Sequence, residues 1–147
     1  MNKTEAATTV TAQVVIDAPR AKVWDVRADI GNAHKWSPDV DASHLTTELT
    51  SGVGAARACT LFGGAANIVE TFTEWEEGRY QAYELTGLEG VGSMNNSFTV
   101  EEVDGGTRVT LSMLYTLDGA DPAEFKTHVS GIAQNVVEGL KEYVEAI

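Results

Sequence analysis

The alternation of apolar and polar residues predicts a chain built mainly of short strands. Residues 8–16 (TTVTAQVVI) alternate as a half-buried strand does. Six further strand-like segments, separated by turn residues, are expected at 43–50, 55–62, 67–76, 79–87, 93–103 and 106–117. The pattern therefore predicts a sheet of seven antiparallel strands.

The C-terminal segment predicts one long amphipathic helix. Asp121 is a suitable N-cap, Pro122 fits the first helical position, and Glu124 lies where a capping-box acid would. Apolar residues then recur at three- and four-residue steps at Phe125, Val129, Ile132, Val136, Leu140, Tyr143 and Ile147. We expect this face to lie on the sheet. The contacts expected are those of Phe125, Ile132 and Val136 with Phe98, Leu111 and Met113.

Two short helices are expected directly after the first strand, where a simple loop would suffice. Apolar residues recur at helical spacing from Pro19 to Gly31, and Gly31 is expected to end the first helix. A second, shorter turn follows at 34–36 and is closed by Ser37-Pro38. The pattern therefore predicts that this segment covers one end of the sheet.

Two glycine turns predict the register of two hairpins. A two-residue turn at Asp104-Gly105 pairs Val100 with Val109, Phe98 with Leu111, Asn96 with Met113 and Met94 with Tyr115. A turn at Glu77-Gly78 pairs Phe72 with Tyr83 and Glu70 with Leu85. The apolar partners share one face, so Glu70 and Asn96 are predicted to be polar residues on that face.

A third hairpin places a possible ion pair on the same face. A turn at Gly64-Ala65 would put Phe62 opposite Asn67, Leu61 opposite Ile68 and Cys59 opposite Glu70, with Arg57 diagonal to Glu70; a loop of odd length would reverse this. Two interpretations stay open. Arg57 and Glu70 form a half-solvated ion pair near the rim, or they form the polar end of a pocket. In the second case Arg57 holds a carboxylate or enolate oxygen and Glu70 orients the ligand or acts as a base.

Composition and charge limit the classes of partner. The 147 residues are 43% hydrophobic and 22% charged, which is typical of one globular domain, with residues 1–7 as a loose tail. A net charge of −12 argues against nucleic acid and against stable membrane association. One cysteine, Cys59, excludes an internal disulfide and favours a reducing, cytoplasmic location, and neither a signal peptide nor a membrane span is expected. The oligomeric state stays open.

Motifs for cofactor, metal or nucleophilic chemistry are absent from the sequence. None of the glycine clusters leads from a strand into a helix, so they are interpreted as turns. His34, His44 and His128 have no metal-ligand spacing, and there is no nucleophile elbow. His128 is expected at the border of the apolar helix face, and Cys59 is interpreted as a small buried apolar residue. No cofactor and no metal are predicted.

The order of elements resembles a known family. The resemblance rests on three segments and the final helix. The segments are VVIDAPRAKVWDVRADIGNAHKWSPDV, ETFTEWEEGRYQAYELTG and GGTRVTLSMLYTL. This layout resembles the α+β helix-grip fold of the START-like (SRPBCC) superfamily, the polyketide cyclase/dehydrase and lipid-transport proteins that include birch-pollen-allergen-like members. The resemblance implies that the short helices close an internal cavity. It places Trp36 at that closure, as a buried anchor or a ligand contact, and the loops 63–66 and 87–92 at the mouth.

Three functions are compatible with such a cavity. The first is binding or transport of one hydrophobic small molecule, lipid-like or polyketide-like. The second is an enzyme of the aromatase/cyclase or dehydratase kind, and the third is a protein-interaction module. The candidate ligand-binding residues are Trp36, Arg57, Glu70, Phe72, Tyr83, Met94, Asn96, Phe98, Met113, Tyr115 and His128. The sequence identifies neither the ligand nor a catalytic residue.

Overall fold

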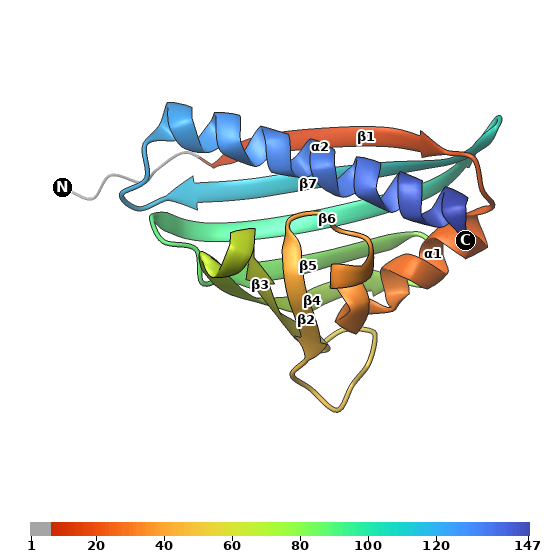
Figure 1. Cartoon of the computed structure of the whole chain (residues 1–147), viewed down its shortest axis with the longest axis horizontal. Coiled ribbons are helices and arrows are strands. Elements are labelled where there is room, and N and C mark those ends of the chain that lie inside the picture. The colour runs from red at the N-terminus through yellow and green to blue at the C-terminus, as the bar shows by residue number, and fades with distance from the viewer. Residues whose placement is uncertain (1–6) are drawn as a thin grey trace.

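A computed structural model describes residues 7–147 as one antiparallel sheet curved around a long helix (Figure 1). The strands are β1 (Thr8–Ile16), β2 (Val40–Leu45), β3 (Ala56–Leu61), β4 (Ala66–Glu76), β5 (Tyr80–Thr86), β6 (Val91–Val103) and β7 (Gly106–Leu117). The helices are α1 (Arg20–Ala28), α2 (Pro122–Ala146) and two short 3-10 segments, η1 (Ile30–Lys35) and η2 (Phe62–Gly64). Residues 1–6 of the expected tail lie outside the described residues.

The seven strands form a single sheet in the order β1-β7-β6-β5-β4-β3-β2, with every neighbouring pair antiparallel. The first strand, β1, lies at one edge of the sheet and pairs with the last strand, β7. The short helices α1 and η1 lie at the end of the sheet where α2 finishes (Figure 1). The predicted α+β helix-grip architecture is confirmed. No helix in the described part of the chain has both the length and the apolar character that crossing a bilayer requires.

The register predicted for two hairpins is confirmed. Val103 pairs with Gly106 across the two-residue Asp104-Gly105 turn, and all four predicted pairs of β6 with β7 are present. The β4–β5 hairpin reaches its predicted register differently, because Glu76 pairs with Tyr80 and the turn is one residue longer than expected. A β-bulge between Phe72 and Glu74 compensates for the extra residue.

The β3–β4 hairpin differs from the prediction by two residues. Leu61 pairs with Ala66, so the connection contains the four residues 62–65 rather than two. Phe62 adopts a positive φ of 55° and begins the η2 turn, which allows the longer loop. The predicted partners of Phe62, Leu61 and Cys59 are therefore wrong. Both loop lengths are even, so the inward face is unchanged and Arg57 lies directly opposite Glu70.

Other element boundaries also differ from the prediction. The second short helix, expected at 34–36, is η1 and spans Ile30–Lys35. Helix α1 ends at Ala28 rather than at Gly31, because Asp29 leaves the helical region with φ −81° and ψ 67°. The strand expected at 43–50 is β2, which starts at Val40 and ends at Leu45. It ends there because the Thr47 hydroxyl donates to a carbonyl two residues ahead and turns the chain.

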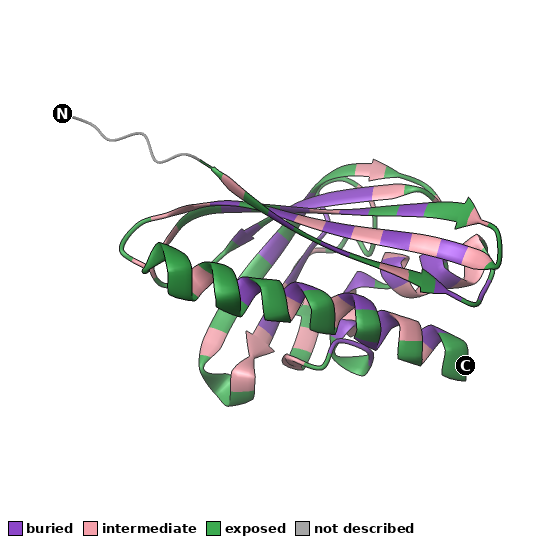
Figure 2. Ribbon diagram, turned by 90° about the horizontal axis from the view of Figure 1, so that it is seen from above, coloured by how far each residue is buried: buried purple, intermediate pink, exposed green. Residues whose placement is uncertain are grey.

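Helix α2 packs across the concave face of the sheet. Its N-terminus is capped as predicted, since the Asp121 carboxylate accepts from the Glu124 N–H at 2.9 Å. Figure 2 shows a buried stripe on the side of the helix that faces the sheet and an exposed opposite side. The fully buried stripe consists of Val129, Ala133, Val137, Leu140 and Val144. It is rotated relative to the predicted face, so Ile132 and Val136 are half-buried and Ile147 is exposed.

Candidate functional site

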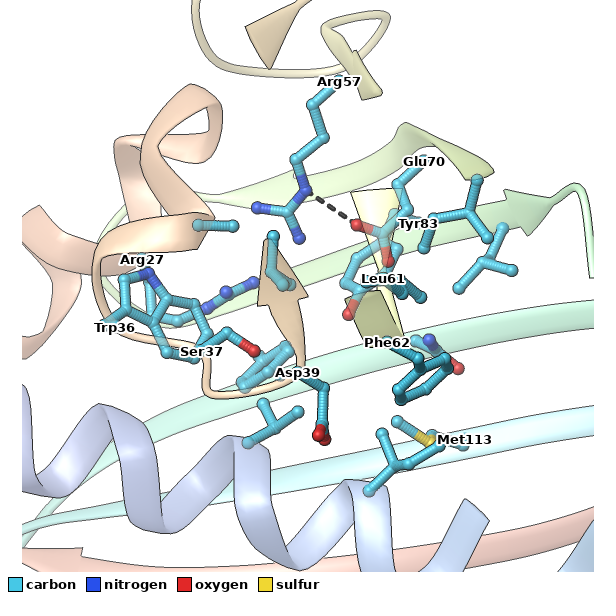
Figure 3. A pocket seen from close by; sticks show the side chains of 18 residues that line it. Arg27, Trp36, Ser37, Asp39, Arg57, Leu61, Phe62, Glu70, Tyr83 and Met113 are labelled. Atoms are coloured by element: carbon cyan, nitrogen blue, oxygen red, sulfur yellow. Dashed lines mark hydrogen bonds and ion pairs between the residues drawn. The ribbon is translucent and has the colours of Figure 1, made fainter. Parts of the chain in front are cut away.

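An internal cavity of about 80 Å³ lies between the sheet, η1 and helix α2. The residues predicted for a ligand site that line it are Trp36, Arg57, Glu70, Tyr83, Asn96, Phe98 and Met113. Ile132 and Val136 border it from α2, which explains why both are only half-buried. Figure 3 shows these side chains converging from the strands, the η1 segment and the helix.

A second cavity of about 80 Å³ adjoins the first toward the start of α2. The two share walls made by Leu61, Phe62, Leu85, Met113 and Ile132. Met94 and His128, both predicted for the site, line this second cavity. Each hollow alone is about half the size of the engineered apolar cavity of about 150 Å³ that binds benzene. A molecule of about one ring would therefore have to occupy both hollows, across the residues that they share.

Phe72 and Tyr115 were also predicted to line the pocket, but neither borders these two cavities. Both face inward as the register requires, and neighbouring rings cover them. The Phe72 ring packs edge-on against Trp75, and the Tyr115 ring packs edge-on against Phe125 at 4.9 Å between centroids. Phe125 thus contacts Tyr115, and it lines the second cavity together with Met113. Because alternation decides only the face of a strand, it could not separate cavity lining from closed core.

The polar end of the first cavity is a buried ion pair. Arg57 Nε donates to Glu70 Oε1 at 2.8 Å, and the two side chains are 4% and 8% exposed (Figure 3). Arg57 Nη1 also donates to the Ile30 carbonyl at 3.0 Å, which ties the β3–β4 hairpin to η1. Burial lowers the pKa of Arg57, but the opposite charge of Glu70 and smaller contributions raise it above its usual value. The half-solvated interpretation of this pair is wrong.

Two further ionisable groups beside the pair stay neutral. Burial, helped by the nearby Glu70 charge, raises the pKa of the Cys59 thiol to about 12 and that of the Tyr83 hydroxyl to about 12. Cys59 is 3% exposed and its sulfur lies 3.8 Å from Glu70 Oε1. The thiol is therefore a protonated, buried group rather than a nucleophile. Tyr83 presents a protonated phenol to the cavity.

Arg27 is the residue of the site that the sequence interpretation missed. It lies in the cavity wall, is 1% exposed, and places Cζ 3.6 Å from the centroid of the Phe98 ring. Within residues 7–147, its three guanidinium nitrogens have no hydrogen-bond partner. Burial lowers its pKa to about 9, so the group is still a cation at neutral pH. Arg27 follows Val23 by four residues and precedes Ile30 by three, and this spacing was the signal for an inward position.

Asn96 occupies the inward position predicted for it. It is 2% exposed and lines the same cavity as Arg27. In the described chain its Oδ1 atom has no hydrogen-bond partner. A buried amide oxygen of this kind is costly in a closed apolar core, so its position in a cavity wall is consistent with a polar ligand contact.

The two tryptophans of the short helices have different surroundings. Trp36 is 8% exposed, lines the cavity and lies 5.4 Å from Arg27 Cζ. Trp24 lies away from this cavity, where its ring packs edge-on against Trp75 and its Nε1 donates to Glu77 at 2.7 Å. Trp24 is thus a packing residue, whereas Trp36 both closes the end of the sheet and contacts the hollow.

The outer border of the second cavity is formed by loop residues and the first part of α2. The Phe62 ring packs against the imidazole of the exposed His128, with 5.5 Å between centroids. Leu88, from the loop expected at the mouth, borders the same cavity. Among the described residues no cluster of three or more His, Cys, Asp or Glu side chains is placed to hold a metal ion.

Three similar solved structures share the fold across nearly the whole chain. Ara h 8.0201 has a TM-score of 0.79 at 18% identity, covering 97% of this chain and 100% of that one. An uncharacterized protein from Bacillus thuringiensis has a TM-score of 0.77 at 21% identity, covering 95% and 98%. The XoxI protein from Bacillus cereus has a TM-score of 0.77 at 20% identity, covering 95% of each chain. Identities this low establish a common fold.

Sequence similarity identifies the family as well. No curated protein matches the chain at a significant level. The family model described as polyketide cyclase/dehydrase and lipid transport matches residues 7–145. This match spans every strand, both short helices and nearly all of α2. The chain therefore belongs to the polyketide cyclase/dehydrase and lipid-transport family.

Proposed function

We propose that this protein binds one small, mainly apolar molecule in the internal cavity, with the polar end of the molecule toward η1. The observation that carries the proposal is a hollow between sheet and helix that is apolar along α2 and charged at Arg57 and Glu70. Pockets for small molecules typically combine apolar walls with a few convergent polar groups. Family membership and the shared fold support the same class of function.

The test is a thermal-shift screen with hydrophobic metabolites of one to two rings, followed by calorimetry on each compound that stabilises the protein. Binding to the native state alone raises stability in proportion to the logarithm of ligand concentration. The informative variant is Val136→Phe, because Val136 borders the first cavity and a larger ring there fills it. Gln134→Phe is the matched control, since Gln134 is exposed on the same helix.

We expect Val136→Phe to lose binding by at least tenfold and Gln134→Phe to bind as the natural sequence does. Equal affinity in both variants would place the ligand outside the cavity. A screen in which no compound stabilises the protein would count against small-molecule binding as its function.

A cyclase or dehydratase activity is the second candidate. The observation that favours it is the Glu70 carboxylate in the same cavity wall as the protonated Tyr83 hydroxyl. A carboxylate and a phenol can accept and donate the protons that enolisation or dehydration requires. Each ligand found in the screen should be incubated with the protein and followed by mass spectrometry for loss of water or cyclisation. Turnover that Glu70→Gln abolishes and the exposed control Glu84→Gln retains would support the enzyme; unchanged ligand would support a binding protein.

A further inference from the structure

Arg27 presents to the first cavity a positive charge that has no direct partner among the described residues. The Arg57 charge is paired with Glu70 at 2.8 Å. Arg27 makes no ion pair within residues 7–147, and its three nitrogens have no hydrogen-bond acceptor there. Asp39 also borders the cavity, but its carboxylate accepts from Asn135 instead. The cavity wall thus holds two guanidinium groups and two carboxylates, and both carboxylates have partners other than Arg27.

The hydrogen-bond donors of Arg27 have no acceptor within residues 7–147. Its guanidinium carbon lies over the Phe98 ring, 3.6 Å from the ring centroid, in a cation–π contact. The N–H donors of a guanidinium lie in its plane and point outward from the edge, in the arrangement that matches a carboxylate. Figure 3 shows the Arg27 side chain beside Trp36 at the end of the cavity nearest η1. The three donor nitrogens are thus buried without an acceptor in the described chain.

Arg57 is a poorer partner for a ligand anion. Its Nε is bonded to Glu70 and its Nη1 to the Ile30 carbonyl. A ligand carboxylate at Arg57 would compete with Glu70 and lie next to a like charge. Arg27 has neither obstacle, and the Asn96 amide in the same cavity wall supplies a second polar contact.

We propose that Arg27 binds an anionic oxygen group of the ligand, a carboxylate or a group of similar charge, while the rest of the ligand fills the apolar part of the cavity. The assignment rests on the proposed function, because it adds a charge to the ligand of that same cavity. It predicts that acids are selected over neutral alcohols of equal size.

The experiment compares phenylacetate with 2-phenylethanol, which share one ring and differ in the anionic group. Calorimetry should be run on the natural protein, on Arg27→Met, and on Arg79→Met as a control for the same charge change at an exposed arginine. We expect the natural protein and Arg79→Met to bind phenylacetate at least about tenfold more tightly than the alcohol. Arg27→Met should lose that preference while its affinity for the alcohol stays within about threefold.

The outcomes separate this proposal from the one on which it rests. If the alcohol and the acid bind the natural protein equally, or if Arg27→Met keeps the preference, the cavity binds ligands but the Arg27 assignment is wrong. If neither probe binds, both proposals fail for ligands of one ring. A second measurement does not depend on the variant's folding: the Arg27 Nε–H signal in a ¹⁵N NMR spectrum should move with phenylacetate and not with 2-phenylethanol. A signal unmoved by bound phenylacetate would overturn the assignment.

Discussion

Removing one partner of the Arg57–Glu70 pair should destabilise the protein far more than removing both. Arg57→Met leaves the Glu70 carboxylate buried without its cation, and Glu70→Leu leaves a second unmatched guanidinium beside Arg27. Each single variant is therefore destabilised by the desolvation free energy of a buried ion that has lost its partner. The double variant replaces the pair with two apolar side chains of similar length and avoids that cost.

The magnitude follows from how deeply the pair is buried. With side chains 4% and 8% exposed, solvent screening is slight, and breaking such a pair costs about 3–5 kcal/mol. Arg57→Met also removes the donor to the Ile30 carbonyl, worth about 1 kcal/mol. At roughly 2–4 °C per kcal/mol for a chain of this size, each single variant should lower the Tm by on the order of 10 °C. The double variant should lie within about 2 kcal/mol of the natural protein, because apolar replacement of buried pairs is often close to neutral.

The assay is urea unfolding of the natural protein, both single variants and the double variant, which together form a double-mutant cycle. The Arg108–Glu101 pair is the internal control, since its side chains are 39% and 50% exposed and its closest atoms are 3.4 Å apart. We expect a coupling energy above about 3 kcal/mol for the buried pair and about 0–1 kcal/mol for the exposed one. Losses that simply add in the buried cycle would refute the reasoning, because they would mean that water solvates each group independently.

Three shorter predictions concern packing and pH. Ile132→Asp puts a carboxylate among the apolar walls of both cavities and should lower the Tm measured by circular dichroism by several degrees or unfold the protein; natural stability would refute the placement of α2. Gly139→Ala should destabilise by about 1–3 kcal/mol despite the higher helix propensity of alanine, because its Cβ would lie 2.6 Å from the Trp36 carbonyl oxygen; a stabilised variant would show that α2 can move away. Indole N–H groups of Trp75 and Trp24 donate to Glu77 and lower its pKa from 4.5, so this contribution is present above that pH and is lost as the pH falls through the lowered value. The Tm difference between the natural protein and Glu77→Gln should therefore be largest at neutral pH and shrink in acid, and a difference independent of pH would contradict this.

The parts of the fold that follow local rules were predictable from the sequence. Asp104-Gly105 allows a two-residue hairpin turn, and that turn determines the pairs of β6 and β7 from Ser93 to Val103. The predicted pairs of β4 with β5 were also correct, although the predicted turn was one residue shorter than the observed one. There the bulge after Phe72 restored the pairing, and no residue in the segment predicts a bulge at that place. The predicted register of β4 and β5 was thus correct because the longer turn and the bulge shift the pairing by one residue in opposite directions.

The β3–β4 loop shows where prediction from local pattern ends. A connection of two residues and one of four leave the same residues facing inward, because side chains alternate with a period of two. The shared face of Arg57 and Glu70 was therefore predictable, whereas their direct pairing was not. The longer loop needs Phe62 at a positive φ, which is uncommon for a residue of its size, and its Gly64 N–H bonds to Asp41 of another strand. Only tertiary contacts select that conformation.

Arg27 was missed for a different reason. The helical spacing predicts that position 27 faces inward, but an arginine at that position is not expected to be buried. Helical spacing from Val23 and Ile30 places residue 27 on the inward face of its helix, but arginine is ordinarily assigned to solvent. The same spacing that identifies an apolar core position thus also identifies a buried charge. The cavity wall holds Arg27, Arg57, Glu70 and Asp39, and of these four Arg27 alone has no hydrogen-bond or ion-pair partner within residues 7–147. The unpartnered guanidinium is therefore evidence about the ligand, because a buried charge without a partner carries a desolvation cost that a bound anion would offset.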